Sequence, residues 1–316
     1  MLNQIKHLLL AGLLLACIYS PPAVRALPAE EPDESHYIYR SNVSEVRIVF
    51  FAKDEHNRPV RDLKTSDFAV VDNERIIRDF RSFSRRDLAK LDVVVLIDSS
   101  ESVLPHFKQE LASTQQLLAS SSWGADDHVS ILTFSGLGAR IVCTADCRNS
   151  FTVQRLGAAP AGGATPLFDA LERANNLLAQ QRQSDVLPLV ILFSDGDDTI
   201  SKSSFRDVLK ELQTSEAQVY SVDLGRPGAS TNGAAILQRF ADDTGGWRFG
   251  LGENSANLFR DIIEDSHSAH IVTYALPKSN SDLHSIRILP THNLKLQFRC
   301  RRAYYRPSSQ HKEEGL

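Results

Sequence analysis

The chain has 316 residues, 42% hydrophobic and 23% charged, an ordinary globular composition that excludes collagen-like, disordered and coiled-coil chains. Lysine and arginine number 35 against 39 aspartates and glutamates, and no basic run is long enough to follow a phosphate backbone, so nucleic acid is not expected as a partner. The length suits one large domain or two modest ones.

Residues 1–26 differ from the rest of the chain and are typical of a secretory signal peptide. Lys6 precedes an apolar run, LLLAGLLLACIY, that is too short to cross a bilayer as a permanent helix. Two processing routes fit this segment: cleavage after Ala26, which we favour, or acylation of Cys17, which lies in a sequence similar to a bacterial lipobox. We therefore expect an extracytoplasmic protein, either secreted or periplasmic, or alternatively anchored through a lipid on Cys17. Residues 27–40, rich in proline and glutamate, are expected to form a flexible leader.

Residues 41–88 show the pattern of β-strands. Apolar side chains occupy alternate positions between Val46 and Lys53, and the segments FAVVD and RIIRDF flank a tight turn at residues 72–74. These strands are too few to form a stable unit alone, so we expect them to pair with strands from elsewhere in the chain.

From Leu91 the pattern changes to strands that alternate with amphipathic helices. DVVVLID and LPLVILFSD are continuous apolar runs, as parallel strands buried on both faces require, and HVSILTF with ARIVCTA predicts a hairpin or an antiparallel edge. Apolar residues at helical spacing predict a first helix through Leu104, Phe107, Leu111 and Leu118. The same spacing predicts further helices around Leu171, Leu209, Leu237 and Ile262. Repeated strand–helix units predict an α/β fold, a doubly wound and mostly parallel sheet, over residues 89–268.

After Ala269 the strand pattern returns in HIVTYAL, HSIRIL and LKLQFRCRRAYY. Neither flank could bury its strands alone, so we expect residues 41–88 and 269–306 to pair into one small β-sandwich beside the α/β domain. Residues 307–316 are expected to be a disordered tail.

Three cysteines follow the predicted signal peptide. Cys143 and Cys147 are spaced to close a small disulfide loop in an oxidising compartment, which would leave Cys300 unpaired; reduced, packed thiols are the alternative. The chain has no C-x₂-C pair, and its ten histidines are scattered without metal-binding spacing, so a zinc site is not expected.

Three loops are predicted to meet at one edge of the sheet. Residues 98–102 and 194–198 directly follow buried strands, and residues 162–167 open a helix. In a doubly wound sheet, ligands bind at the carboxyl ends of the strands, so these loops can converge there. They would bring together the hydroxyls of Ser100, Ser102 and Thr165 and the carboxylates of Asp98 and Asp195. Such hard oxygen ligands suit Mg²⁺ and do not suit a metal that prefers thiolate or imidazole.

This arrangement resembles the von Willebrand factor A domain family over about residues 91–268. The family's D-x-S-x-S motif appears as Asp98, Ser100 and Ser102, its distant threonine in a GG-T-P-L context as Thr165, and its second aspartate in an S-D-G context as Asp195. The resemblance implies a metal-ion-dependent adhesion site in which the hydroxyls are direct ligands and the aspartates act largely through water. It implies Mg²⁺ as the metal, with Mn²⁺ or Ca²⁺ as alternatives.

Two further features bear on this resemblance. Glu101 stands where the family usually has glycine; its side chain is expected to face solvent, and the alternative is that it reaches the open position of the metal. The flanks look like those of bacterial secreted proteins related to this family, whose N-terminal strands carry a V-x-D-L-x-x-x-D-F pattern. That looser match falls on Val60, Leu63, Asp67 and Phe68.

The sequence predicts a binding module without enzymatic activity. Three hydroxyls and two water-mediated carboxylates cannot fill six positions around Mg²⁺, so we expect an Asp or Glu of a protein partner to complete the shell. One alternative is a scaffold whose metal only stabilises the fold. Another is a phosphatase of the haloacid-dehalogenase type, because residues 195–199 spell D-x-D-x-T, with Asp195 and Asp197 as its acids. Such an enzyme would need a later acidic pair at a strand end, whereas Asp242-Asp243 follows a helical pattern.

Overall fold

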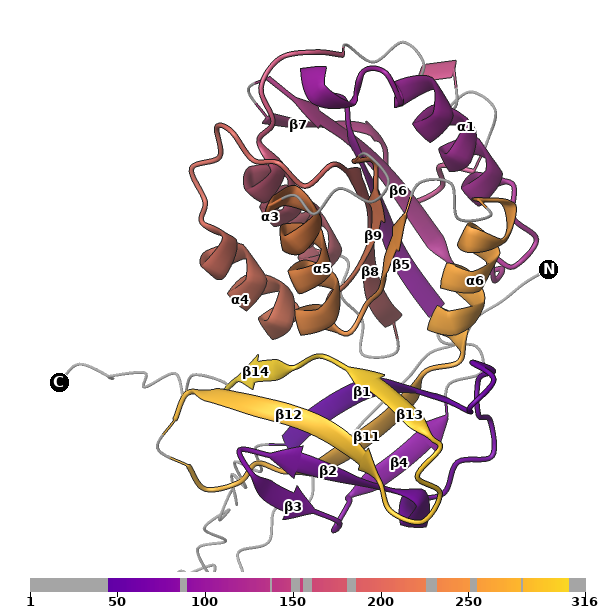
Figure 1. The fold of residues 1–316 in the computed structure, drawn as a ribbon, viewed down its shortest axis with the longest axis vertical. Helices are drawn as coiled ribbons and strands as arrows, with labels where there is room; N and C mark the ends of the chain where they lie inside the picture. Colours follow the sequence, from indigo (N-terminus) through magenta and orange to yellow (C-terminus); the bar gives the residue numbers. More distant parts are fainter. Residues whose placement is uncertain are drawn as a thin grey trace, which may run out of the picture. The chain divides into compact units, whose positions relative to one another are not determined.

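The computed structural model describes residues 45–85, 90–136, 138–148, 154–155, 161–180, 186–225, 232–250, 255–279 and 281–306 (Figure 1). The predicted signal peptide, leader and C-terminal tail lie outside these residues, as do both processing sites, Ala26 and Cys17. No helix formed by the described residues is both long and apolar enough to span a membrane.

A six-stranded sheet forms the centre of the α/β part of the chain. In the order β10-β9-β8-β5-β6-β7, it consists of β10 (Arg248–Gly250), β9 (Gln218–Asp223), β8 (Val186–Ser194), β5 (Lys90–Asp98), β6 (His128–Ser135) and β7 (Gly138–Cys143). Neighbouring strands pair in parallel except β6 and β7, which form the predicted antiparallel edge. The apolar runs in β5 and β8 are buried along almost their whole length, because helices cover both faces of the sheet.

Five helices pack on this sheet within the described residues: α1 (Phe107–Leu118), α3 (Leu167–Gln180), α4 (Phe205–Ser215), α5 (Asn232–Thr244) and α6 (Ser255–His267). Figure 1 shows α3, α4 and α5 on one face and α1 and α6 on the other, and each set covers a separate apolar cluster. Of the four apolar residues whose spacing predicts the first helix, Leu104 lies outside α1. A short 3₁₀ helix, η2 (Glu101–Val103), follows β5 and turns Val103 into the core, which leaves Leu104 42% exposed.

The flanks of the α/β part form two four-stranded antiparallel sheets. The first, in the order β13-β1-β11-β4, consists of β13 (Gln297–Cys300), β1 (Glu45–Lys53), β11 (His270–Ala275) and β4 (Ser82–Arg85). The second, in the order β14-β12-β2-β3, consists of β14 (Ala303–Tyr305), β12 (Leu283–Pro290), β2 (Phe68–Asp72) and β3 (Arg75–Ile77). Each sheet contains strands from before and after the α/β part. The fold class predicted from the sequence is thus confirmed, while the domain boundaries stay predictions.

The first of these sheets is covered on both faces. Along β1, Ile48 and Phe50 belong to the apolar core that the two sheets share, whereas Val49 and Phe51 join the apolar cluster of the α/β part that includes residues of α6. Successive strand residues point to opposite faces, so the alternation along β1 divides its side chains between two cores. The chain enters the α/β part after β4 and leaves it before β11, and these strands pair with His270 opposite Arg85.

Cys143 and Cys147 form a disulfide, with Cα atoms 5.7 Å apart, at the edge strand β7. Cys300, in β13, is free. The structure thus favours the disulfide over the pair of reduced thiols.

Candidate metal centre

Backbone hydrogen bonds join the three predicted loops to one another. The Gly162 N–H donates to the carbonyl of Ser99 (2.6 Å), and the Glu101 N–H donates to the carbonyl of Gly163 (3.0 Å), so the first loop holds the second. The Thr199 N–H donates to the carbonyl of Thr165 (2.9 Å), which attaches the third loop to the second. The loops therefore meet at the carboxyl ends of β5 and β8, as the motif spacing predicts.

Asp98, the last residue of β5, is fully buried beneath these loops. Its Oδ1 accepts the N–H of Ser100 (2.9 Å), and its Oδ2 accepts the hydroxyl of Ser194 (2.7 Å). Burial raises the pKa of Asp98 to about 6 and the charge of Asp195 adds to the increase, while the hydrogen bonds oppose it. Both carboxylate oxygens are engaged by the protein, which suits a role at a metal through water.

Ser194 is a site residue that the sequence analysis missed. Besides donating to Asp98, its hydroxyl accepts the N–H of Gly196 (3.0 Å), so it ties the end of β5 to the loop after β8. The signal was present in the S-D-G motif, where Ser194 stands directly before Asp195.

The hydroxyls provide a donor set that fits a small divalent cation. The Oγ atoms of Ser100 and Ser102 lie 3.2 Å apart, and Thr165, on the second loop, is 3% exposed. Octahedral Mg²⁺ with oxygen ligands at about 2.1 Å places neighbouring ligands about 3.0 Å apart, close to the spacing of the two serine hydroxyls. Nowhere in the described part of the chain do three His, Cys, Asp or Glu side chains gather as a metal site. A cation held here would therefore depend on the hydroxyls.

The loop that carries Asp195 packs against the first turn of α5. Gly196 has a φ of 80°, and a Cβ on it would lie 2.2 Å from the carbonyl oxygen of Gly233. Conversely, a Cβ on Gly233 would lie 2.2 Å from the carbonyl oxygen of Asp195. Because neither glycine has a side chain, the backbone of the Asp195 loop packs directly against the backbone of α5. This contact fixes the position of Asp195.

The acidic residues around the site have different environments. Asp197 is exposed; its N–H donates to Asp195 Oδ1 (3.1 Å), and partial burial followed by the charge of Asp195 raises its pKa. Asp198 instead turns toward α3, where its Oδ1 accepts the N–H of Phe168 (3.2 Å). Glu101 is exposed, in agreement with the expectation that it faces solvent.

The acidic pair that the phosphatase alternative requires does not lie at a strand end. Asp242 and Asp243 belong to the last turn of α5 and pair with Arg302, at 2.8 and 3.3 Å. Along the helix axis they are roughly 13 Å from the turn that contacts the Asp195 loop. The arrangement needed by such an enzyme is therefore not formed with this pair.

The family model of the von Willebrand factor type A domain matches residues 93–197, a range that includes all five predicted metal ligands. The resemblance inferred from the motifs is thereby confirmed, and the α/β part of the chain contains a domain of this family. The match ends within the third loop, so it does not cover the strands of the two flanking sheets.

Curated relatives include two proteins named magnesium-chelatase 60 kDa subunit. The one from Rhodobacter capsulatus is 28% identical over 137 residues, which is 42% of this chain and 24% of the relative. The one from Cereibacter sphaeroides is 31% identical over 125 residues, which is 40% of this chain and 22% of the relative. The chain thus spans less than a quarter of the length of these relatives.

Similar solved structures include an aerotolerance-related membrane protein from Bacteroides fragilis, with 17% identity and a TM-score of 0.42 over 55% of this chain and 98% of that one. Another is manganese-loaded TRAP protein from Plasmodium vivax, with 14% identity and a TM-score of 0.46 over 74% of this chain and 97% of that one.

Proposed function

We propose that this chain is a metal-dependent binding module that holds a divalent cation, foremost Mg²⁺, at its three joined loops. The hydroxyls of Ser100, Ser102 and Thr165 bind the ion directly, and Asp98 and Asp195 act on it through water. The observation that carries the proposal is the state of Asp98: a buried carboxylate, engaged on both oxygens, lies beneath a pair of serine hydroxyls at the spacing of neighbouring metal ligands.

The donor set also supports the kind of partner. Neutral hydroxyls donate little charge, so the ion stays electrophilic and has coordination positions to spare. A carboxylate of a protein partner is the hard, anionic ligand that such an ion prefers. Exposed Asp197 and Glu101 would repel an acidic partner unless the cation is present, so the ion controls binding. The module binds its partner and does not transform it.

We further propose that the protein works outside the cytoplasm. The disulfide between Cys143 and Cys147 supports this location, because such bonds persist in oxidising compartments and are rare in the cytosol. The signal-like residues 1–26 agree with it.

Calorimetric titration with Mg²⁺, Mn²⁺ and Ca²⁺, combined with thermal unfolding, tests the metal site. We expect saturable binding and a stabilisation of about 2.7 kcal/mol at a metal concentration 100 times Kd. Thr165→Ala should abolish both without unfolding the sheet, since Thr165 lies in a loop, and Asp126→Ala, which removes an exposed carboxylate elsewhere, should change neither. The site assignment fails if Thr165→Ala titrates like the wild-type protein.

A second titration distinguishes a metal that binds an acidic partner from a metal that only stabilises the fold. Blocked peptides with a single aspartate, such as acetyl-Gly-Asp-Gly-amide, should bind the Mg²⁺-loaded protein and lose binding in chelator. A matched peptide with asparagine should not bind. If the metal stabilises the fold while the aspartate peptide binds no better than the asparagine peptide, the metal is structural and the scaffold alternative holds.

A further inference from the structure

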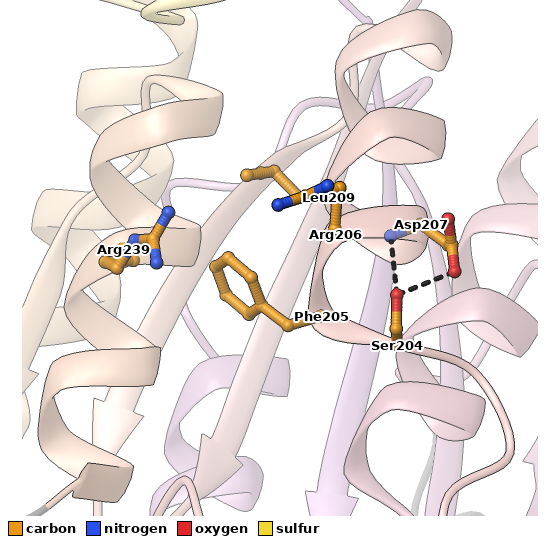
Figure 2. A pocket seen from close by; sticks show the side chains of 6 residues that line it. All are labelled: Ser204, Phe205, Arg206, Asp207, Leu209 and Arg239. Carbon is orange, nitrogen blue, oxygen red and sulfur yellow. Dashed lines mark hydrogen bonds between the residues drawn. The ribbon is translucent and has the colours of Figure 1, made fainter.

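An open hollow of about 600 Å³ lies between α4 and α5. It is lined by Ser204, Phe205, Arg206, Asp207, Leu209 and Arg239. In Figure 2 the ring of Phe205 lies between Arg239, from α5, and Arg206 with Leu209, from α4. The hollow is thus lined by the aromatic ring of Phe205 and by guanidinium groups from two helices.

The charges that line this hollow leave cationic groups available. The guanidinium of Arg239 lies 4.6 Å from the ring centre of Phe205, and its nearest carboxylate, Asp243 at 3.9 Å, is shared with Arg302. Within the described part of the chain, no ion pair joins Arg206 to a carboxylate. Asp207, the one acid among the lining residues, accepts the hydroxyl of Ser204 (2.6 Å). Charge complementarity therefore favours an anionic occupant, and planar guanidinium groups match a carboxylate in geometry.

The third metal loop connects this hollow with the candidate metal centre. The segment that continues from this loop to α4 is anchored on the first turn of α3, because Asp169 Oδ1 accepts the N–H groups of Lys202 (3.0 Å) and Ser203 (2.9 Å). The rings of Phe168, which follows Thr165 by three residues, and Phe205 are 6.1 Å apart. The loop is thus held at several points between Asp195 and the start of α4, so the metal centre and the hollow keep a fixed separation.

We propose that the partner that completes the metal shell makes a second contact with this domain, by a carboxylate that binds between the guanidinium groups of Arg206 and Arg239. The inference rests on the proposed function, since the first contact is the acidic ligand of the metal. One exposed ion pair contributes little by itself. Once the first acid is on the metal, however, the second contact forms within the complex, where the effective concentration of the second acid is high.

Peptides with two acids at controlled spacing test this proposal. The probes are acetyl-Asp-(Gly)n-Asp-amide, with n from two to ten, and the matched peptides in which the second aspartate is asparagine. Asp195 and Phe205 are ten positions apart, with nine residues between them, so the longest of these spacers, when extended, reaches at least as far as the chain between the two sites can. At the best spacer length, we expect the two-acid peptide to bind the Mg²⁺-loaded protein about fivefold more tightly than its asparagine partner.

Variants test whether the tighter binding of the two-acid peptide depends on the arginines of the hollow. The double variant Arg206→Gln with Arg239→Gln should remove the fivefold gain and leave Mg²⁺ affinity and single-acid binding unchanged. Arg173→Gln, which removes an exposed cation from α3, should retain the gain. Asp207→Asn should increase it, because it removes the carboxylate that opposes the bound acid. The proposal is overturned if the second aspartate gives no gain at any spacer length, or if the double variant retains the gain.

The NMR resonances of the arginine Nε–Hε groups provide a readout that needs no metal. A peptide with one aspartate, titrated in chelator at low salt, should shift the resonances of Arg206 and Arg239 and leave that of Arg173 in place. If single-acid peptides fail to bind through the metal, the proposed function fails. The Nε–Hε resonances of Arg206 and Arg239 then still test the hollow separately. A shift of both resonances supports a carboxylate site there, and unchanged resonances refute it.

Discussion

Replacing Gly233 by alanine tests whether the Asp195 loop rests on α5 as the structure shows. In most helices this change stabilises a protein by about 1 kcal/mol, because alanine loses less backbone entropy on folding. Here the new Cβ would stand 2.2 Å from the carbonyl oxygen of Asp195 and 2.9 Å from Asp197 Oδ1. Normal contact needs about 3.4 Å or more, so the Asp195 backbone would have to move by more than about 1 Å.

The magnitude follows from two opposing effects. Overpacking of this kind costs about 1 to 3 kcal/mol, against a helix gain of about 1 kcal/mol, so we expect Gly233→Ala to lower the free energy of unfolding by about 1 to 2 kcal/mol. Residues that orient metal ligands typically account for a 10- to 100-fold effect on metal affinity. Displacing Asp195 should therefore weaken Mg²⁺ binding at least about tenfold.

Urea unfolding and calorimetric Mg²⁺ titration measure the two effects separately. Ala235→Gly is the matched control: Ala235 is exposed on the same helix, so this change should cost about 1 kcal/mol through helix propensity and leave metal affinity unchanged. A Gly233→Ala protein that is more stable than the wild type and binds Mg²⁺ equally well would refute the contact between the loop and α5.

Three further changes probe the buried groups around the sheet. Asp92, near the start of β5, is 3% exposed, and burial raises its pKa to about 6. Because the pKa of an unfolded aspartate is about 3.9, ionisation of Asp92 destabilises the fold as the pH rises from about 3.9 to about 6. Asp92→Asn should thus be more stable than the wild type by up to about 3 kcal/mol at pH 7 and equally stable near pH 3, and a difference independent of pH would contradict this account. Ser194→Ala should cost about 1 to 3 kcal/mol, because it leaves Oδ2 of buried Asp98 without its donor; an unchanged urea midpoint would rule out that hydrogen bond. Replacing Cys143 and Cys147 by serine should lower stability by about 2 kcal/mol, as expected for a short closed loop, and equal stability with and without reductant in the wild type would argue against the disulfide.

The parts of the fold that the sequence predicted are those specified by local patterns. The run from Val93 to Ile97 is apolar at every position, which in a strand means burial on both faces, and the structure buries it completely. The site loops were predictable because strand ends in such a sheet share one edge, so a motif after each of two strands suffices to bring their residues together.

The parts that escaped prediction depend on contacts between distant segments. The approach of Gly196 to Gly233 joins residues 37 positions apart, and neither glycine differs in its local sequence from one in an ordinary turn. Leu104 continues the helical spacing of apolar residues but lies in the bend after η2, a turn with no strong sequence signal. Ser194 was overlooked because a serine beside an aspartate also suits a simple turn.

The pairing of β4 with β11 has a mechanical consequence. These strands lead into and out of the α/β part, so tension on a partner held there would pull both of them in the same direction along their length. Strand β11 also pairs with β1 at six positions, from Glu45 opposite Ala275 to Phe50 opposite His270. Sliding β11 past β1 would break the hydrogen bonds of this ladder together, in shear, and would not open them one at a time like a zipper. The strand pair β4–β11 would thus transfer a force applied to the α/β part to the β1–β11 hydrogen bonds as a group.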